Sequence, residues 1–129
     1  MRFWKRWKVR RLLRNRSGIR LDLACGGNKQ PGFVGMDIRR EEGVDIVHDL
    51  EEIPWPLPDG CCSLIMASHI MEHINPARFG FVRVMDECWR VLQPEGQLAI
   101  VMPHGRSSGY LQDPTHVNQR NEATWAYFD

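Results

Sequence analysis

The sequence has no apolar run long enough to cross a membrane. Its longest uncharged apolar stretches, such as the one around Leu64 to Ala67, fall far short of the ~20 residues that a membrane helix needs. Residues 1–20 are basic, but no apolar stretch of signal-peptide length follows them. We therefore expect neither a membrane span nor a signal peptide.

Cysteine is scarce and poorly spaced for cross-linking or for zinc. The four cysteines are Cys25, Cys61, Cys62 and Cys88, and no Cys-x-x-Cys pair is present. Adjacent cysteines such as Cys61 and Cys62 cannot easily form a simple disulfide framework. Reduced thiols are the simplest interpretation, and they favour a cytoplasmic protein.

Acidic residues are absent from residues 1–20, which hold nine of the 17 Lys and Arg residues; the rest of the chain holds all 16 acids. The length of 129 residues suits one domain. We therefore divide the chain into a basic arm, residues 1–17, and a more acidic domain, residues 18–129. Two interpretations of the arm stay open. It binds nucleic acid, a membrane or a partner through residues 1–16, or it docks its aromatic side chains on the domain.

Short apolar runs separated by turn residues predict five strands after the arm. They cover residues 19–23, 33–37, 44–47, 63–67 and 97–102. Such runs joined by connectors, with one strand-helix-strand unit, are typical of an α/β protein with a parallel sheet. We find no internal repeat.

Two helices are predicted from caps and from apolar spacing. Asn75 and Pro76 suit the start of the first helix, and Pro94 and Gly96 its end. Its expected buried stripe consists of Phe81, Met85, Cys88, Trp89 and Leu92. A second, short helix is expected from Glu122 to Phe128, with Asn121 as its cap.

Three acidic residues lie at the ends of the first three predicted strands. Asp22 precedes a turn of small residues, Asp37 ends the second strand and Asp49 follows the third. Parallel sheets bind ligands outside the carboxyl ends of their strands, and an acid there can accept bonds from both ribose hydroxyls. The three acids together predict a nucleoside pocket.

Four segments in order resemble the class I S-adenosylmethionine-dependent methyltransferase family, of the type 11 kind. They are LDLACGGN, GFVGMDI, HDLEEIPWPLPDGCCSLIMASHIMEHI and ECWRVLQPEGQLAIVMP. The resemblance runs from about Ile19 to Pro103. It implies a Rossmann-like parallel sheet of about five strands in the order 3-2-1-4-5, S-adenosylmethionine as cofactor, and methyl transfer to an acceptor that the sequence does not identify.

The resemblance also implies where the cofactor binds. Asp22, Ala24 and Gly26 would face its methionine end, with Cys25 and Asn28 in the same turn. For Asp22 the alternative is a purely turn-stabilising acid. The family usually has glycine where Ala24 and Asn28 stand, but alanine is small and asparagine tolerates left-handed backbone, so we expect an altered, working turn.

The other implied cofactor contacts follow later strands. Asp37, with Ile38 beside it, would hold the ribose, and Asp49 and Leu50 would border the adenine. The alternative for Asp37 is a solvated strand end. Ser68, together with His69, would lie nearest the methyl group.

Two further departures concern the connections of the family fold. Residues 28–32 are too few for the full helix that usually joins the first two strands. The family also continues beyond the fifth strand, so we expect this chain to lack the family's C-terminal strands, as a fragment or a minimal relative would. We expect the fifth strand to present an open edge, a liability that a homodimer, through that edge or the arm, would relieve.

Histidines are the candidate bases for activating an acceptor, since histidine titrates near neutral pH. His69, His73, His104 and His116 are the candidates, with His69 best placed and His116 in a polar loop after the fifth strand. The alternatives are that His73 packs on the following helix and that His116 caps a turn. We expect no metal site, because the spacing of His69 and His73 does not match His-Glu-x-x-His and no cysteine pair accompanies them.

Two other functions compete with methyl transfer. One is a non-catalytic nucleoside- or cofactor-binding module whose arm holds nucleic acid, a membrane or a partner. The other, a nicotinamide dehydrogenase domain, is weaker because Gly-x-Gly-x-x-Gly is absent. The chain also lacks the Asp/Asn-Pro-Pro-aromatic stretch of amino-methylating DNA enzymes and the Pro-Cys nucleophile of cytosine C5 enzymes.

Overall fold

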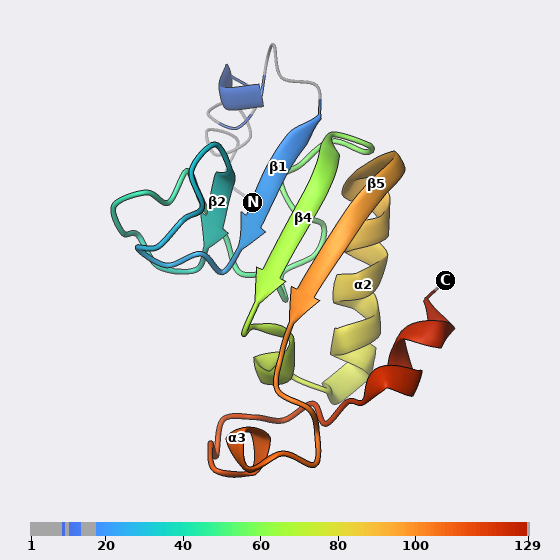
Figure 1. Ribbon diagram of the computed structural model, residues 1–129. Helices are drawn as coiled ribbons and strands as arrows, with labels where there is room; N and C mark the ends of the chain where they lie inside the picture. Colours follow the sequence, from blue (N-terminus) through green and yellow to red (C-terminus); the bar gives the residue numbers. More distant parts are fainter. Residues whose placement is uncertain (1–8, 10, 14–17, 129) are drawn as a thin grey trace.

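A computed structural model describes residues 9, 11–13 and 18–128. Its five strands are β1 (Ile19–Leu23), β2 (Val34–Asp37), β3 (Ile46–Val47), β4 (Cys62–Ser68) and β5 (Leu92–Val101). All neighbours pair in parallel, in the order β3-β2-β1-β4-β5 (Figure 1). The predicted α/β class and strand order are confirmed.

The fifth strand begins earlier than predicted. β5 starts at Leu92, which pairs with Cys62, whereas Leu64 pairs with Gln97, so the intervening residues form an irregularity in the ladder. Pro94 has no N–H for the ladder, and Glu95 takes a left-handed φ of 64°. The Pro94-Glu95-Gly96 turn therefore interrupts the pairing but does not prevent a strand from forming before it.

The main helix begins later than predicted. Asn75 accepts a bond from the Ala77 N–H at 2.9 Å, but Arg78 and Phe79 are left-handed, with φ of 54° and 58°. The segment is therefore split into η2 (Ala77–Phe79), a 3₁₀ turn, and α2 (Gly80–Val91). Figure 1 shows α2 running beside β5.

The buried face of α2 differs from the predicted stripe at two residues. Leu92 lies beyond the helix, as the first residue of β5, and is only partly buried. Trp89 is 81% exposed, so its assignment to the core was wrong, whereas Phe81, Met85 and Cys88 are buried. Val84 and Val91 complete the buried face instead. These positions follow i, i+3, i+4, i+7 spacing from Phe81, and Trp89 lies to the side of that stripe.

The connection from β1 to β2 contains turns and no helix, as its length predicted. Ala24 and Gly26 have left-handed φ angles of 53° and 51°. The turn packs directly on β2 at Gly35, where a Cβ atom would lie only 2.6 Å from the sulfur of Cys25. Glycine at position 35 thus allows the turn to lie against the sheet.

The chain after β5 folds back toward the end of β4. It contains α3 (Ser108–Leu111) and η3 (Glu122–Tyr127), a 3₁₀ helix capped by the Asn121 side chain, close to the predicted second helix. The Val117 N–H donates to the Glu72 carbonyl at 2.8 Å, in η1 (Met71–His73). The buried Asn118 side chain donates to the carbonyls of Met71 and Ile74. These bonds fix the loop against η1.

Part of the predicted arm packs against the core. Val9 is 7% exposed, and Leu12 and Leu13 also contact the core cluster. The aromatic residues of the arm, at positions 3, 4 and 7, lie outside the described residues. In the described part of the chain, β5 pairs only with β4 and no helix is long and apolar enough to span a membrane. All four cysteines are free.

Candidate functional site

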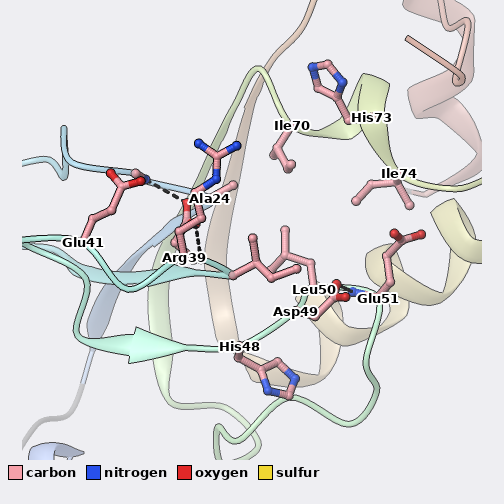
Figure 2. A pocket seen from close by; sticks show the side chains of 13 residues that line it. Ala24, Arg39, Glu41, His48, Asp49, Leu50, Glu51, Ile70, His73 and Ile74 are labelled. Carbon is pink, nitrogen blue, oxygen red and sulfur yellow. Dashed lines mark hydrogen bonds between the residues drawn. The ribbon is translucent and has the colours of Figure 1, made fainter. Parts of the chain in front are cut away.

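A cavity of about 420 Å³ opens at the carboxyl ends of β1, β2 and β3 (Figure 2). Its volume falls within the range of ~300–1,000 Å³ that is usual for small-molecule sites. Six of the residues expected to bind the cofactor line it: Ala24, Gly26, Asp37, Ile38, Asp49 and Leu50. These strand ends therefore surround one cavity, whose use by the cofactor stays a prediction.

Asp37 is the most firmly held acid of this cavity. It is 7% exposed, and its Oδ2 accepts a bond from the Gly26 N–H at 2.9 Å while Oδ1 accepts from the Arg39 N–H at 2.8 Å. The bond to Gly26 ties the end of β2 to the turn after β1. Each carboxylate oxygen keeps a further lone pair, so both can still accept a ligand hydroxyl.

The segment after β3 forms a second wall. Asp49 Oδ1 accepts a bond from the Glu51 N–H at 2.9 Å, which stabilises a tight turn. Glu51 Oε1 in turn accepts from the Asn75 N–H at 2.8 Å, in the segment that leads into η2. Figure 2 shows Asp49, Leu50 and Glu51 together on this wall. The bond from Asn75 links the wall to the chain that follows η1.

The lining combines acidic groups with apolar surface. The acids are Asp37, Glu41, Asp49 and Glu51, against a single arginine, Arg39. Ile38 is 63% exposed although it is apolar, and Ile70 and Ile74 line the cavity near η1. An acidic lining favours a cationic ligand over an anionic one, and the isoleucines can contact a flat, weakly polar ring.

Five expected cofactor residues do not line the cavity: Asp22, Cys25, Asn28, Ser68 and His69. Asp22 is 5% exposed and its Oδ2 accepts a bond from the Gln30 N–H at 2.9 Å, so it stabilises the turn after β1. Burial, with Asp22 and Asp37 close by, raises the pKa of the Cys25 thiol to about 11. Cys25 is therefore a neutral thiol near pH 7.

The two candidate catalytic histidines occupy different settings. His69 follows β4 with a left-handed φ of 53°, and its side chain is 65% exposed. Its Nδ1 lies 3.5 Å from Oε1 of Glu72. The His116 side chain is only 9% exposed, and its Nδ1 lies 2.8 Å from the Tyr110 carbonyl. His73, which was the less favoured candidate, is the one that lines the cavity.

Several lining residues were not predicted from the sequence. They are Arg39, Glu41, His48, Glu51, Ile70 and Ile74. Arg39 and Glu41 closely follow the expected ribose acid, so their position was a usable signal. His48 is 4% exposed, and its Nε2 lies 2.7 Å from the carbonyl oxygen of Glu52. Nothing in the sequence distinguished it from a core histidine.

Comparison with protein-family models gives a match over more than half of the chain. The model described as a methyltransferase domain matches residues 28–100. The matched range includes β2, β3, β4 and α2 and nearly all of β5. No curated protein matches the sequence.

Solved structures share the fold at low sequence identity. A methyltransferase from Archaeoglobus fulgidus described as S-adenosylmethionine-dependent has a TM-score of 0.70 at 23% identity, covering 95% of this chain and 64% of its own. The YcgJ protein from Bacillus subtilis has a TM-score of 0.61 at 18% identity, covering 98% of this chain and 66% of its own. The chain thus spans just under two thirds of each.

One further structural neighbour catalyses another kind of reaction. The [4+2]-cyclase SpnF has a TM-score of 0.59 at 18% identity, covering 96% of this chain and 55% of its own. A shared fold therefore does not fix the reaction, which has to be argued from the site. Membership of the methyltransferase domain family indicates S-adenosylmethionine as the cofactor.

Proposed function

Because the chain belongs to the methyltransferase domain family, we propose that it binds S-adenosylmethionine in the cavity at the strand ends and transfers the methyl group to an acceptor. Bound there, the cofactor supplies an electrophilic methyl group on a sulfonium. The protein has to bind it, hold it in one orientation and guide an acceptor into line with it. The identity of the acceptor is not part of this proposal.

The observation that carries the proposal is the charge of the lining. Four acidic residues and a single arginine line the cavity, together with three isoleucines. S-adenosylmethionine carries a sulfonium, an ammonium and one carboxylate, so it is a net cation, which such a lining attracts. A nicotinamide dinucleotide carries a pyrophosphate, which the same acids would repel. The lining therefore favours the methyl donor over the dehydrogenase alternative.

Individual residues would act through their observed geometry. The two oxygens of Asp37, already fixed by backbone N–H groups, would accept the two ribose hydroxyls. Ile38 and Leu50 would contact the adenine from the walls after β2 and β3. The left-handed turn at Ala24 and Gly26 would let the backbone approach the cofactor closely.

The acceptor would approach from the end of β4. His69 is exposed there, and its Nδ1 faces a carboxylate oxygen of Glu72. That contact would orient the ring and leave Nε2 free to take a proton from an acceptor hydroxyl or amine. His116 is held away from solvent, and we propose another role for it below.

Calorimetry with S-adenosylhomocysteine tests the cofactor proposal without knowledge of the acceptor. We expect binding by the full chain, and an affinity ~10–100-fold lower for Asp37→Asn, because hydrogen bonds to a charged group contribute about 1.5–3 kcal/mol. Glu42→Ala is the matched control, since Glu42 is exposed on the same loop and does not line the cavity. Absence of binding by the folded wild-type chain would refute the proposal.

The binding-module alternative and the partner predictions concern mainly the arm. Contact of residues 1–16 with nucleic acid or a membrane remains a proposal, as do dimerisation and a cytoplasmic location. Binding of nucleic acid by the arm would weaken steeply as salt is raised, since it would release counterions from phosphates. Deleting residues 1–8 removes four of the eight cations of residues 1–16 and should then weaken the salt-dependent binding, whereas binding left unchanged by the deletion would count against the arm.

A further inference from the structure

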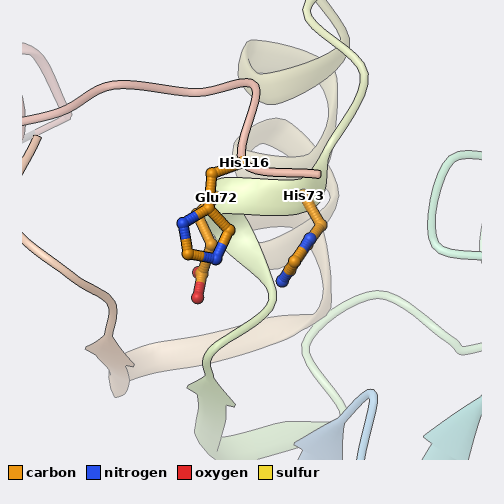
Figure 3. A group of neighbouring side chains, drawn as sticks. All are labelled: Glu72, His73 and His116. Atoms are coloured by element: carbon orange, nitrogen blue, oxygen red, sulfur yellow. The ribbon is translucent and has the colours of Figure 1, made fainter. Parts of the chain in front are cut away.

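Three potential metal ligands meet beside the cavity. Glu72, His73 and His116 each offer one ligand atom, and these atoms lie within 4.8 Å of one another. Figure 3 shows the three side chains together, two from η1 and one from the loop after β5. The loop is fixed there by the bonds from Val117 and Asn118 to η1, so the group is held together by backbone structure.

The neighbours of the two histidine rings favour one tautomer for each. His73 Nδ1 lies 3.2 Å from the Thr115 carbonyl and 3.1 Å from Thr115 Oγ1, whose hydrogen is donated to Asp113 Oδ1. His116 Nδ1 lies 2.8 Å from the Tyr110 carbonyl. A carbonyl oxygen only accepts, so each Nδ1 carries a proton and donates it. In the neutral rings both Nε2 atoms then present a lone pair. Metal-binding histidines commonly have this arrangement, with the second ring nitrogen donating to a backbone carbonyl.

Glu72 is the third member, and only its Oε1 has a possible donor nearby, His69 Nδ1 at 3.5 Å. Its side chain is 1% exposed, and its Oε2 has no hydrogen-bond partner among the described residues. A buried, unpartnered carboxylate oxygen is costly unless a cation or a donor completes it. Asp113 adds to the imbalance, because its Oδ2 lies 3.4 Å from His116 Nε2. The cluster therefore contains an unpartnered carboxylate oxygen and a second carboxylate nearby, a combination that favours a cation.

We propose that Glu72, His73 and His116 bind one divalent transition-metal ion. Two imidazoles and a carboxylate are ligands that zinc, iron, cobalt and nickel accept in proteins, whereas magnesium and calcium prefer oxygen alone. Ligand atoms of a tetrahedral zinc site lie ~3.4 Å apart, given bond lengths of ~2.0–2.2 Å. The partly exposed His73 side chain has to rotate slightly to close the group from its present spacing.

The site adjoins the proposed cofactor cavity through His73, which belongs to both. The sequence argued against a metal because it considered the pair His69 and His73 alone, and it did not place His116 beside Glu72. Resting on the proposed function, the metal would bind an oxygen of the acceptor at the rim of the cavity. The metal site itself does not depend on that function.

Metal binding is tested on the full chain after treatment with a chelator. Titration with zinc chloride in the absence of cofactor should give one site per chain, and cobalt should give a visible absorption band typical of nitrogen and oxygen ligands. His73→Ala and Glu72→Gln should each lower the zinc affinity by more than about 100-fold, because losing only a hydrogen-bond partner of a ligand costs ~10–100-fold. Zinc should also raise the Tm of the wild type, and a chelator should reverse this.

The matched control is His104→Ala. His104 also faces a glutamate, with its Nε2 3.1 Å from Glu122 Oε2, but it lies outside the cluster. Its variant should bind zinc as the wild type does. His73 is the decisive position because it is partly exposed, so its replacement should leave the fold intact. Wild-type protein that binds neither ion, or His73→Ala protein that binds zinc equally well, would overturn the proposal, whether or not S-adenosylhomocysteine binds.

Discussion

Two buried glutamates in this molecule have opposite surroundings. Glu87 on α2 is 5% exposed, and its carboxylate accepts bonds from Arg90 Nε, Arg90 Nη2 and the Trp55 N–H, each at 2.8 Å. Glu72 on η1 is 1% exposed, yet one of its oxygens has no partner among the described residues and the other has only His69 at 3.5 Å. Burial alone does not distinguish them, whereas their partners do.

The difference separates a structural carboxylate from a candidate functional one. Arg90 also donates to the Leu57 carbonyl at 2.9 Å, so its pair with Glu87 ties α2 to the segment before β4. Burial acts to raise the pKa of Glu87, but the bonds from Arg90 and the Trp55 N–H outweigh it and lower that pKa. Both carboxylate oxygens of Glu87 accept hydrogen bonds, whereas one oxygen of Glu72 has no partner among the described residues.

Breaking the pair of Glu87 and Arg90 should have the largest effect on the free energy of unfolding. Arg90→Ala removes five hydrogen bonds and leaves the Glu87 charge buried with one donor. We expect the free energy of unfolding to fall by ~3–5 kcal/mol, as for other broken buried pairs. Urea denaturation measures it, with the exposed Arg83→Ala on the same helix as the control. A loss below 1 kcal/mol would show that the pair is dispensable.

The same pair makes stability depend on pH. Glu87 has a lowered pKa in the folded chain, so its contribution is complete above the usual glutamate pKa of about 4.3 and is lost as the pH falls through the folded pKa. Glu87→Gln should cost ~2 kcal/mol at pH 7. The difference in free energy of unfolding between Glu87→Gln and the wild type should become smaller below about pH 4. Denaturation curves from pH 3 to 7 measure this, and a constant difference would contradict it.

Replacing Glu72, the glutamate with an unpartnered oxygen, should change the free energy of unfolding in the opposite direction. In the presence of a chelator, Glu72→Gln removes a buried charge, and its amide can donate to a neighbouring lone pair. We expect the free energy of unfolding to rise by ~1 kcal/mol, the reverse of Glu87→Gln. With zinc, the variant should lose the stabilisation that the wild type gains. A loss as large as that of Arg90→Ala would make Glu72 a structural residue and remove the comparison.

Replacing Glu122, an exposed glutamate, should have the smallest effect on stability. Glu122 faces His104 at 3.1 Å, but its side chain is 86% exposed, and such pairs contribute little because water screens them. Glu122→Gln should leave the Tm unchanged within error at low and at high salt. A clear, salt-dependent fall in Tm would show that this loop contributes more than its exposure suggests.

The sheet was largely predictable from the sequence, because each strand has a compact apolar run and a turn at its end. Ile19–Leu23 was predicted to the residue, and the strand order followed from the family resemblance. The errors lie where local backbone departs from regular geometry. Left-handed Arg78 and Phe79 delay the start of α2, and the Pro94-Glu95-Gly96 turn lies within β5 where the sequence suggested a boundary.

The candidate site was predictable only as far as strand ends determine it. Asp37 and Asp49 line one cavity because parallel strands bring their carboxyl ends to the same edge. Glu72, His73 and His116 come together through the return of the chain after β5, which apolar periodicity does not reveal. The grouping of these three side chains therefore had to be found in three dimensions.

At Ala24 and His69, the stability of the fold conflicts with a fixed backbone at the proposed site. Both residues follow a strand directly, and both have a left-handed φ of 53°, a conformation that costs a side-chain-bearing residue of the order of 1 kcal/mol. Glycine at either position would relieve that strain and let the chain tolerate more heat. It would also make the ends of β1 and β4 more flexible, and these ends would position the proposed cofactor and acceptor. Selection for robustness and selection for turnover would thus pull these two positions in opposite directions.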